Sequence, residues 1–141
     1  MHVLVTGAAG FIGYHLAKRL LAAGHSVVGL DNMNAYYDVG LKEARLGELA
    51  RLPQARAFRF VRLDLADAEG MARLFTAERF THVVNLAAQA GVRHSLKDPA
   101  SYLSSNLTGF GHVLEGCRQN GVEHLVFASS SSVYGLNAAM P

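Results

Sequence analysis

The chain has 141 residues, the length of one ordinary domain, and half of them are hydrophobic. The charged fraction of only 17% argues against a disordered chain. The net charge is +2 and there is no basic block, so the sequence gives no indication of nucleic acid or an anionic membrane as a partner. The single cysteine, Cys117, cannot form an internal disulfide, and no apolar run approaches the roughly 20 residues of a transmembrane helix. Because the opening MHVLVTGAAG also lacks a basic leader, we expect a soluble cytoplasmic protein.

Apolar runs alternate with amphipathic segments along the whole chain. The runs are typical of buried strands, and the segments between them have helical spacing and cap residues. Asp38, Asp67 and Asp98 are the predicted helix N-caps, with Pro99 in the first turn of the last helix. In chain order we predict a strand at residues 2–7, a helix at 11–24, a strand at 26–31, a helix at 36–52, a strand at 57–64, a helix from 67, a strand at 81–87, a helix at 98–121 and a strand at 124–129.

The last predicted helix carries one apolar stripe, the pattern of a helix that faces a core. Asn106 lies beside this stripe, so its amide either bonds backbone across a cleft or is exposed. The stripe consists of Leu103, Leu107, Phe110, Leu114 and Cys117.

Repeated alternation of strand and helix predicts a parallel sheet that is covered by helices on both faces. A glycine-rich first turn suggests the strand order 3-2-1-4-5, the first part of a doubly wound α/β fold of the Rossmann type. The charges of Arg59 and Arg62 suit an outer position for their strand. Nothing marks a second domain, so residues 1–141 are expected to form one dinucleotide-binding domain.

The stretch TGAAGFIG joins the first strand to the first helix with the spacing G-x-x-G-x-x-G. Gly7 permits the tight turn, Gly10 lets a phosphate approach the backbone, and Gly13 lets the helix pack close to the sheet. The helix start, at Phe11 and Ile12, offers free N–H groups and a positive dipole end to a pyrophosphate. Glycine triplets also occur in ordinary turns, but a strand before and a helix after favour binding of a dinucleotide.

Asp31 ends the second strand, near the offset of about 20 residues at which an acid takes the ribose hydroxyls. Its carboxylate would repel a 2′-phosphate, which favours NAD over NADP, and Asn32 can share the ribose contact. The alternative is that both residues only start a turn. Asp64, at the end of the third strand, either accepts from an adenine amino group or is a solvated strand end.

The loop NLAAQAGVRHS, at residues 85–95, follows the fourth strand, where open α/β sheets bind ligands. Its small residues leave room for a flat ring, although a plain strand-to-helix connection also uses small residues. Arg93 is a candidate anion clamp or a solvated side chain. His94 is interpreted as a loop residue, and no metal site is expected.

These motifs together resemble the extended short-chain dehydrogenase/reductase family, in its branch of NAD-dependent nucleotide-sugar epimerases and dehydratases. The resemblance rests on TGAAGFIG, Asp31-Asn32, Asp64-Leu65, NLAAQAGVR, the segment 106–109 and SSSSVYG. Within this branch, DNMNAYYDVGLKEARL and AGVRHSLKDPASYLSSNLTG look most like the UDP-glucuronate 4-epimerases.

The resemblance implies a redox cycle on the sugar: hydride leaves carbon 4 for NAD, the keto sugar rotates, and hydride returns to its other face. It implies that Ser130 hydrogen-bonds the reacting oxygen and that Arg93 holds the glucuronate carboxylate. It also implies a homodimeric parent protein that acts on a nucleotide sugar. The residues it places beside the cofactor, in addition to the glycine loop and the acids above, are Leu65, Leu86, Ala87, Ala88 and Asn106.

The sequence departs from the family pattern at its end. Dehydratases of the family carry an Asp-Glu pair where this chain has Ser131 and Ser132, which disfavours dehydration. No Lys follows Tyr134, so the family's Tyr-x-x-x-Lys motif is absent, and we expect an amino-terminal part of an epimerase with negligible activity alone.

Several alternatives remain open at this point. The chain can be a dinucleotide-binding module without chemistry, part of a UDP-sugar decarboxylase or reductase, or a piece that does not stay folded alone. The serines at 129–132 can form a flexible tail. Because they follow an apolar strand and precede Val133-Tyr134-Gly135, we interpret them as the rim of an active site.

Overall fold

Five parallel strands form one sheet in the computed structural model, which describes residues 1–136 except for the side chain of Ser131. The strands lie in the order β3-β2-β1-β4-β5, which confirms the predicted Rossmann-type topology. β2 has the predicted bounds, and the other strands end earlier than predicted because their last residues already belong to loops. The strands are β1 (His2–Thr6), β2 (Ser26–Asp31), β3 (Phe58–Arg62), β4 (His82–Asn85) and β5 (His124–Phe127).

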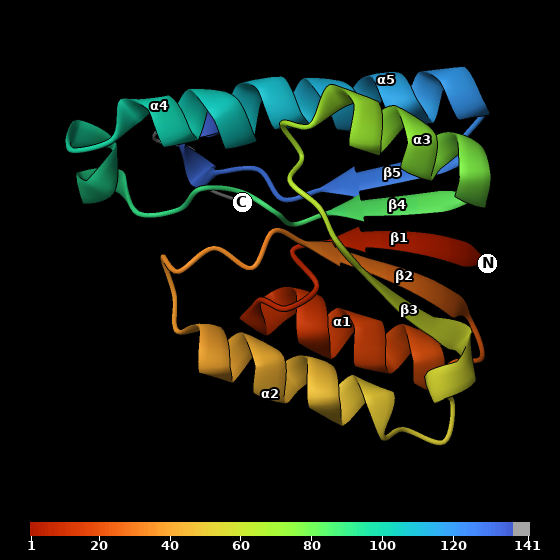
Figure 1. Cartoon of the computed structure of the whole chain (residues 1–141). Coiled ribbons are helices and arrows are strands. Elements are labelled where there is room, and N and C mark those ends of the chain that lie inside the picture. The colour runs from red at the N-terminus through yellow and green to blue at the C-terminus, as the bar shows by residue number, and fades with distance from the viewer. Residues whose placement is uncertain (137–141) are drawn as a thin grey trace.

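Helices cover both faces of the sheet (Figure 1). α1 (Phe11–Ala22) and α2 (Val39–Ala50) lie on one face, and α3 (Ala68–Glu78), α4 (Pro99–Tyr102) and α5 (Phe110–Asn120) lie on the other. β1 is buried on both sides, since Val3 and Val5 pack into the core with α1 while Leu4 packs into the core with α3. Within residues 1–136, no helix is both long and apolar enough to cross a membrane.

The predicted capping residues begin three of the helices. Asp38, Asp67 and Asp98 each accept a hydrogen bond from the backbone N–H three residues further on, and Pro99 occupies the first turn of α4. β3 lies at the edge of the sheet, as the charges of Arg59 and Arg62 predicted.

The last helix differs from its prediction in two ways. It is not one α-helix, because a π-helical segment, Leu103–Gly109, separates α4 from α5. The stripe is also only partly buried, since Leu103, Leu107 and Leu114 are exposed whereas Phe110 and Cys117 pack against the core. The buried side chain of α5 is that of Val113, and two glycines let the helix approach closely: a Cβ atom at Gly109 would lie 2.6 Å from Leu65, and one at Gly116 would lie 2.6 Å from Phe75.

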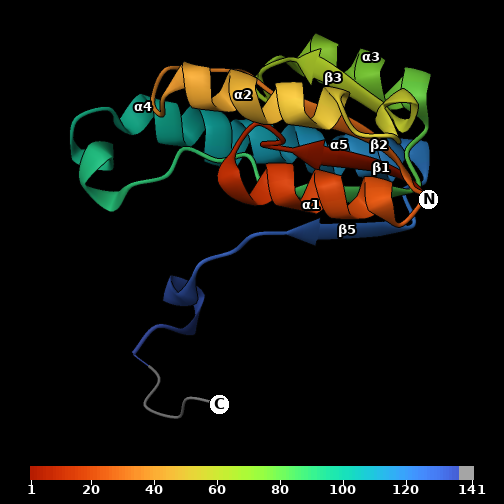
Figure 2. The ribbon, with the colours of Figure 1, turned by 90° about the horizontal axis from the view of Figure 1, so that it is seen from below.

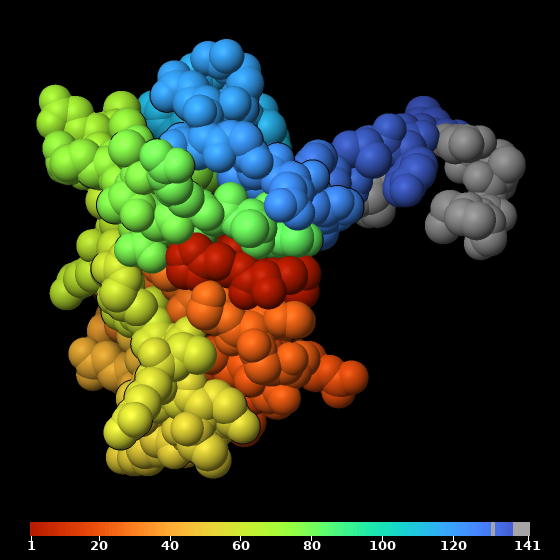
Figure 3. Space-filling view, turned by 90° about the vertical axis from the view of Figure 1, so that its right-hand side faces the viewer, coloured from red at the N-terminus to blue at the C-terminus, as the bar shows by residue number. Residues whose placement is uncertain are grey.

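The strand ends place the loops of the two halves opposite each other. Thr6 pairs with Leu30 on β2 and with Asn85 on β4, so the carboxyl ends of the three strands are level. The chain leaves β1 toward one face and β4 toward the other, which makes this the point where a doubly wound sheet opens a crevice. The segment after β5, residues 128–136, extends away from the layered body (Figure 2 and Figure 3).

Candidate NAD site

A cavity of about 560 Å³ opens at the carboxyl ends of the strands, within the size range of ligand pockets. The loops after β1, β2, β3 and β4 all contribute to its wall. Every predicted cofactor residue except Asn106 lines it. These residues are Gly7, Gly10, Phe11, Ile12, Gly13, Asp31, Asn32, Asp64, Leu65, Leu86, Ala87 and Ala88.

The glycine loop has the geometry that a close ligand requires. Gly7 has a φ of +68°, and a Cβ atom there would lie 3.0 Å from the backbone nitrogen of Ala87. A Cβ atom at Gly13 would overlap the carbonyl oxygen of Gly7. Gly10 is the N-cap of α1 and provides no side chain to bond the first N–H groups of the helix. The first residues of the helix line the cavity, so the loop fits a pyrophosphate.

The end of β2 carries a buried carboxylate. Asp31 accepts hydrogen bonds from Met33 N–H at 2.9 Å and from Ala9 N–H at 3.3 Å. It also forms a buried ion pair with Lys42 on α2, at 3.2 Å. Arg45, one turn further along α2, donates to the carbonyl oxygen of Ala9 at 3.2 Å.

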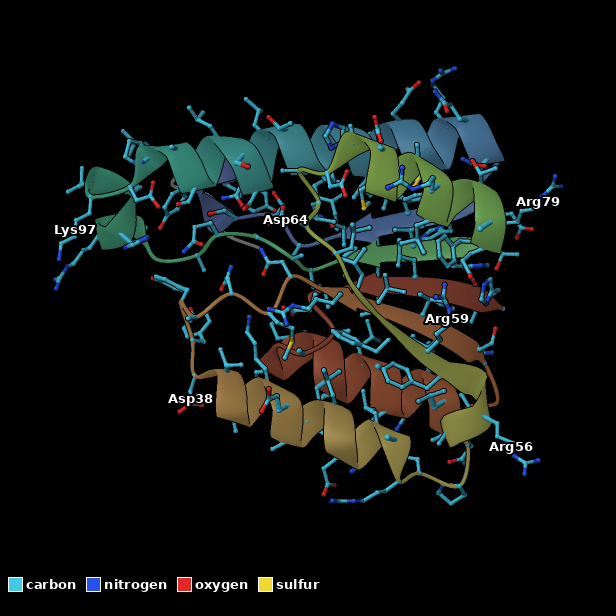
Figure 4. All side chains as sticks on the ribbon, viewed as in Figure 1. Asp38, Arg56, Arg59, Asp64, Arg79 and Lys97 are labelled. Carbon is cyan, nitrogen blue, oxygen red and sulfur yellow. The ribbon has the colours of Figure 1, made fainter. Side chains whose placement is uncertain are left out.

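Asn32 and Asp64 come from neighbouring strands and meet at the edge of the cavity. The side-chain amide of Asn32 donates to Asp64 at 2.8 Å, and the other carboxylate oxygen of Asp64 accepts from Ala66 N–H at 2.9 Å. Figure 4 shows Asp64 at the end of β3, on the side where the loops gather. Asp64 is one of the residues that line the cavity.

Two side chains fix the backbone of the loop after β4. The buried hydroxyl of Thr6 donates to Asn85 at 2.7 Å and accepts from the N–H groups of Leu86 and Ala87 at 3.1 and 3.0 Å. Asn106 accepts from the N–H of Gln89 at 2.8 Å and donates to its carbonyl oxygen at 2.9 Å. Both alternatives for Asn106 therefore hold, because it bonds backbone and is also exposed. It acts on the cavity through Gln89 without lining it.

Aromatic side chains join the two halves of the cleft at its rim. Tyr36, from the loop after β2, lies with its ring centroid 4.9 Å from that of His94, from the loop after β4. Tyr102 donates to the carbonyl oxygen of Ala90 at 2.8 Å. Desolvation and the neighbouring Tyr36 raise the pKa of Tyr102 above its usual 10, so it is a neutral donor at physiological pH.

The two predicted sugar-contacting residues lie outside the cavity wall. Arg93 is exposed in the short helical turn Val92–Leu96. Ser130 is exposed as well and caps the turn Ser131–Tyr134 by accepting from the N–H of Ser132 at 3.2 Å. The structure therefore does not bring Ser130 and Arg93 together with the cofactor residues.

Several residues of the site were missed by sequence reasoning. Lys42 carried a signal, because it lies seven residues before the buried Leu49 and so on the packed face of α2. Thr6, Arg45 and Gln89 gave no comparable signal, since their roles depend on contacts with distant loops. Within residues 1–136 no three His, Cys, Asp or Glu side chains are grouped to hold a metal ion.

The sequence matches the model of the NAD dependent epimerase/dehydratase family over residues 3–141. The chain belongs to this family. The resemblance stated above is thereby confirmed at the level of the epimerase/dehydratase family. Across its curated relatives, the chain spans between 31% and 41% of their length.

Relatives and solved structures of this family are similar over nearly the whole chain. UDP-glucuronate 4-epimerase 1 of Arabidopsis thaliana is 51% identical over 140 residues, which are 99% of this chain and 32% of the relative. The structure of UDP-glucuronic acid 4-epimerase from Bacillus cereus, in complex with UDP-glucuronic acid and NAD, is 34% identical with a TM-score of 0.84. The similarity extends over 99% of this chain and 43% of the Bacillus cereus chain.

A UDP-glucose 4-epimerase is also similar. The structure from Thermus thermophilus, in complex with NAD, is 45% identical with a TM-score of 0.76 and covers 92% of this chain and 38% of that one. Epimerases that act on different UDP-sugars therefore share this fold with the chain.

Proposed function

We propose that this chain is the NAD-binding part of a UDP-glucuronate 4-epimerase. The observation that carries the proposal is the cavity at the strand ends, whose wall combines the glycine loop, Asp31 and the small residues Ala87 and Ala88. Five UDP-glucuronate 4-epimerases of Arabidopsis thaliana, 49% to 51% identical over 140 residues, support the choice of sugar.

Each part of the wall has one task in this proposal. The N–H groups at the start of α1 bind the pyrophosphate, and Asp31 accepts hydrogen bonds from the adenosine ribose. Ala87 and Ala88 leave room for the nicotinamide, and the Thr6 and Asn106 contacts hold their loop in place. When bound, NAD supplies a reversible hydride acceptor for carbon 4 of the sugar.

Two residues outside the cavity wall are proposed to bind the sugar. We assign to Ser130 a hydrogen bond to the reacting sugar oxygen and to Arg93 a bidentate contact with the glucuronate carboxylate. Because residues 1–141 contain no Tyr-x-x-x-Lys motif, the chain by itself binds NAD without turning over UDP-glucuronate. Turnover by the purified chain above that of a Ser130→Ala variant would contradict this.

Titration of the chain with NAD tests the cofactor assignment. Asp31→Asn removes the charge that accepts from the ribose and is expected to weaken NAD binding by about 1.5–3 kcal/mol, measured by calorimetry. Asp67→Asn is the matched control, because Asn caps α3 as well as Asp does and lies outside the cavity wall. An Asp31→Asn variant with the affinity of the control would refute the role of Asp31.

UDP-glucose is the second candidate substrate, favoured by the 45% identity to the Thermus thermophilus enzyme. Arg93→Ala separates the two in a protein that carries this sequence at the full length of its relatives. We expect kcat/KM to fall more for UDP-glucuronate than for UDP-glucose, because only the former has a carboxylate for the guanidinium. Equal losses for the two sugars would show that Arg93 does not recognise the carboxylate.

A further inference from the structure

Lys42 is a buried lysine beside the proposed ribose site. Its exposed fraction is 6%, and that of Asp31, with which it forms the ion pair, is also 6%. Lysine is almost never buried to this degree unless it is paired. Its position at the start of α2 also places a positive charge near the positive end of the helix dipole, so helix stability does not explain it.

Global stability does not explain the pair well either. A buried ion pair costs the hydration of both groups, and apolar residues of the same volume often stabilise a fold as much or more. A lysine and an aspartate in this place are therefore better explained by what they do for the cavity, whose wall both residues form.

The hydrogen bonds of Asp31 divide its two oxygens into different roles. Oδ1 accepts from Met33 N–H at 2.9 Å and from Lys42 Nζ at 3.2 Å, which fills its two lone-pair directions. Within residues 1–136, Oδ2 accepts only from Ala9 N–H, at the longer distance of 3.3 Å. Oδ2 therefore retains a lone pair for a ligand in the cavity.

We propose that Lys42 is a positioning residue for the adenosine ribose. By binding Oδ1, its ammonium fixes the rotation of the Asp31 carboxylate, so that Oδ2 accepts the hydrogen bond of the ribose 2′-hydroxyl. Lys42 thereby sets the selectivity of the site for a ribose that has this hydroxyl. The proposal rests on the NAD binding proposed above and adds a residue that determines its specificity.

The experiment compares NAD with its analogue that lacks the 2′-hydroxyl of the adenosine ribose, by calorimetric titration of the whole chain. The wild-type chain is expected to bind NAD about tenfold or more tightly than the analogue, since a hydrogen bond to a charged group is lost. Lys42→Met keeps the length of the side chain and removes its charge, and it is expected to bring this ratio close to one. Lys97→Met, at an exposed lysine that points away from the body (Figure 4), is expected to keep the wild-type ratio.

Lys42→Met leaves Asp31 unpaired, and the variant can fail to fold for this reason. In that case a second comparison tests whether Lys42 acts through Asp31. Asp31→Asn and the double variant Asp31→Asn/Lys42→Met are expected to have the same ratio, because Lys42 acts through the carboxylate that both lack. A further loss of selectivity in the double variant would overturn the proposal.

The remaining outcomes are equally distinct. A Lys42→Met variant that binds both ligands more weakly by the same factor would show a structural role and would overturn the proposal, as would an unchanged ratio. If the wild-type chain does not bind NAD at all, both the proposed function and this inference are overturned. If the wild-type chain binds NAD but Lys42→Met has the wild-type ratio of the affinities for NAD and the analogue, only the inference is overturned.

Discussion

Gly13 has no side chain, and this lets α1 pack in direct contact with the turn that follows β1. At this position a single methyl group would meet the backbone of Gly7, which no rotamer change can relieve. The same contact brings the first residues of α1 to the cavity wall. Gly13 is therefore required both for the packing of α1 and for the shape of the cavity.

Gly13→Ala is expected to destabilise the chain by about 3 kcal/mol or more, because the added carbon forces the helix away from the turn. Urea unfolding followed by circular dichroism measures this change. Gly111→Ala on α5 is the matched control, since a Cβ atom there has no neighbour within 4 Å. The control is expected to be more stable than the wild type by up to about 1 kcal/mol, as for Gly to Ala in any exposed helix. Equal stability of the two variants would contradict the proposed overlap.

Among the elements, the long helix α4 to α5 shows how one segment serves two purposes. Its π-helical part holds Asn106 against Gln89 and so supports the loop of the cavity. Its second part packs through Gly116 against Phe75 of α3. Burial raises the pKa of Cys117 on this part to about 11, so its thiol is protonated and unreactive at neutral pH.

The carboxyl end of α5 carries a pH-dependent ion pair. Hydrogen bonds from Arg118 lower the pKa of Glu115 from 4.5 to about 2. Because the folded-state pKa is depressed, the contribution of Glu115 to stability is present above about pH 4.5 and is lost as the pH falls to about 2. Glu115→Gln is therefore expected to lower the urea midpoint at pH 6 and to converge with the wild type near pH 2. A difference that does not depend on pH would contradict this, and Glu43→Gln on α2 is the control for removing an exposed carboxylate.

At the scale of the whole molecule, β5 exposes apolar side chains on both of its faces among the residues that the structure describes. β5 is an edge strand, and its Val126 and Phe127 are 47% and 49% exposed. The ring of Phe127 lies 5.0 Å from that of Phe110, which connects this strand to the exposed leucines of the stripe. Edge strands with exposed apolar side chains promote association between chains.

We expect the chain to associate with itself through this edge strand as its concentration rises. Val126→Lys places a charge on the edge strand and is expected to shift the chain toward monomer in sedimentation velocity. Leu96→Lys is the control, because Leu96 is 87% exposed but lies in the turn after β4. If both variants associate as the wild type does, β5 is not the contact.

The sequence alone predicted the order of elements, the strand order and half of the residues that line the cavity. These features depend on local signals: the apolar period, the capping aspartates and the glycine spacing act over a few residues. The strand order follows because parallel strands joined by right-handed crossovers leave few topologies. Asp31 and the loop 86–88 could be found because this topology places every strand end at one edge.

Only the tertiary structure decided which residues meet across that edge. The pairing of Lys42 with Asp31 and the clamp of Asn106 on Gln89 join positions 11 and 17 residues apart, whose approach depends on how the helices pack on the sheet. Packing also decided that Gly109, Val113 and Gly116 face the core and that the leucines of the stripe do not. The two glycines permit a closer approach than apolar periodicity reveals. Local patterns determined the elements and their order, and side-chain volume and hydrogen-bond geometry determined which of their faces met.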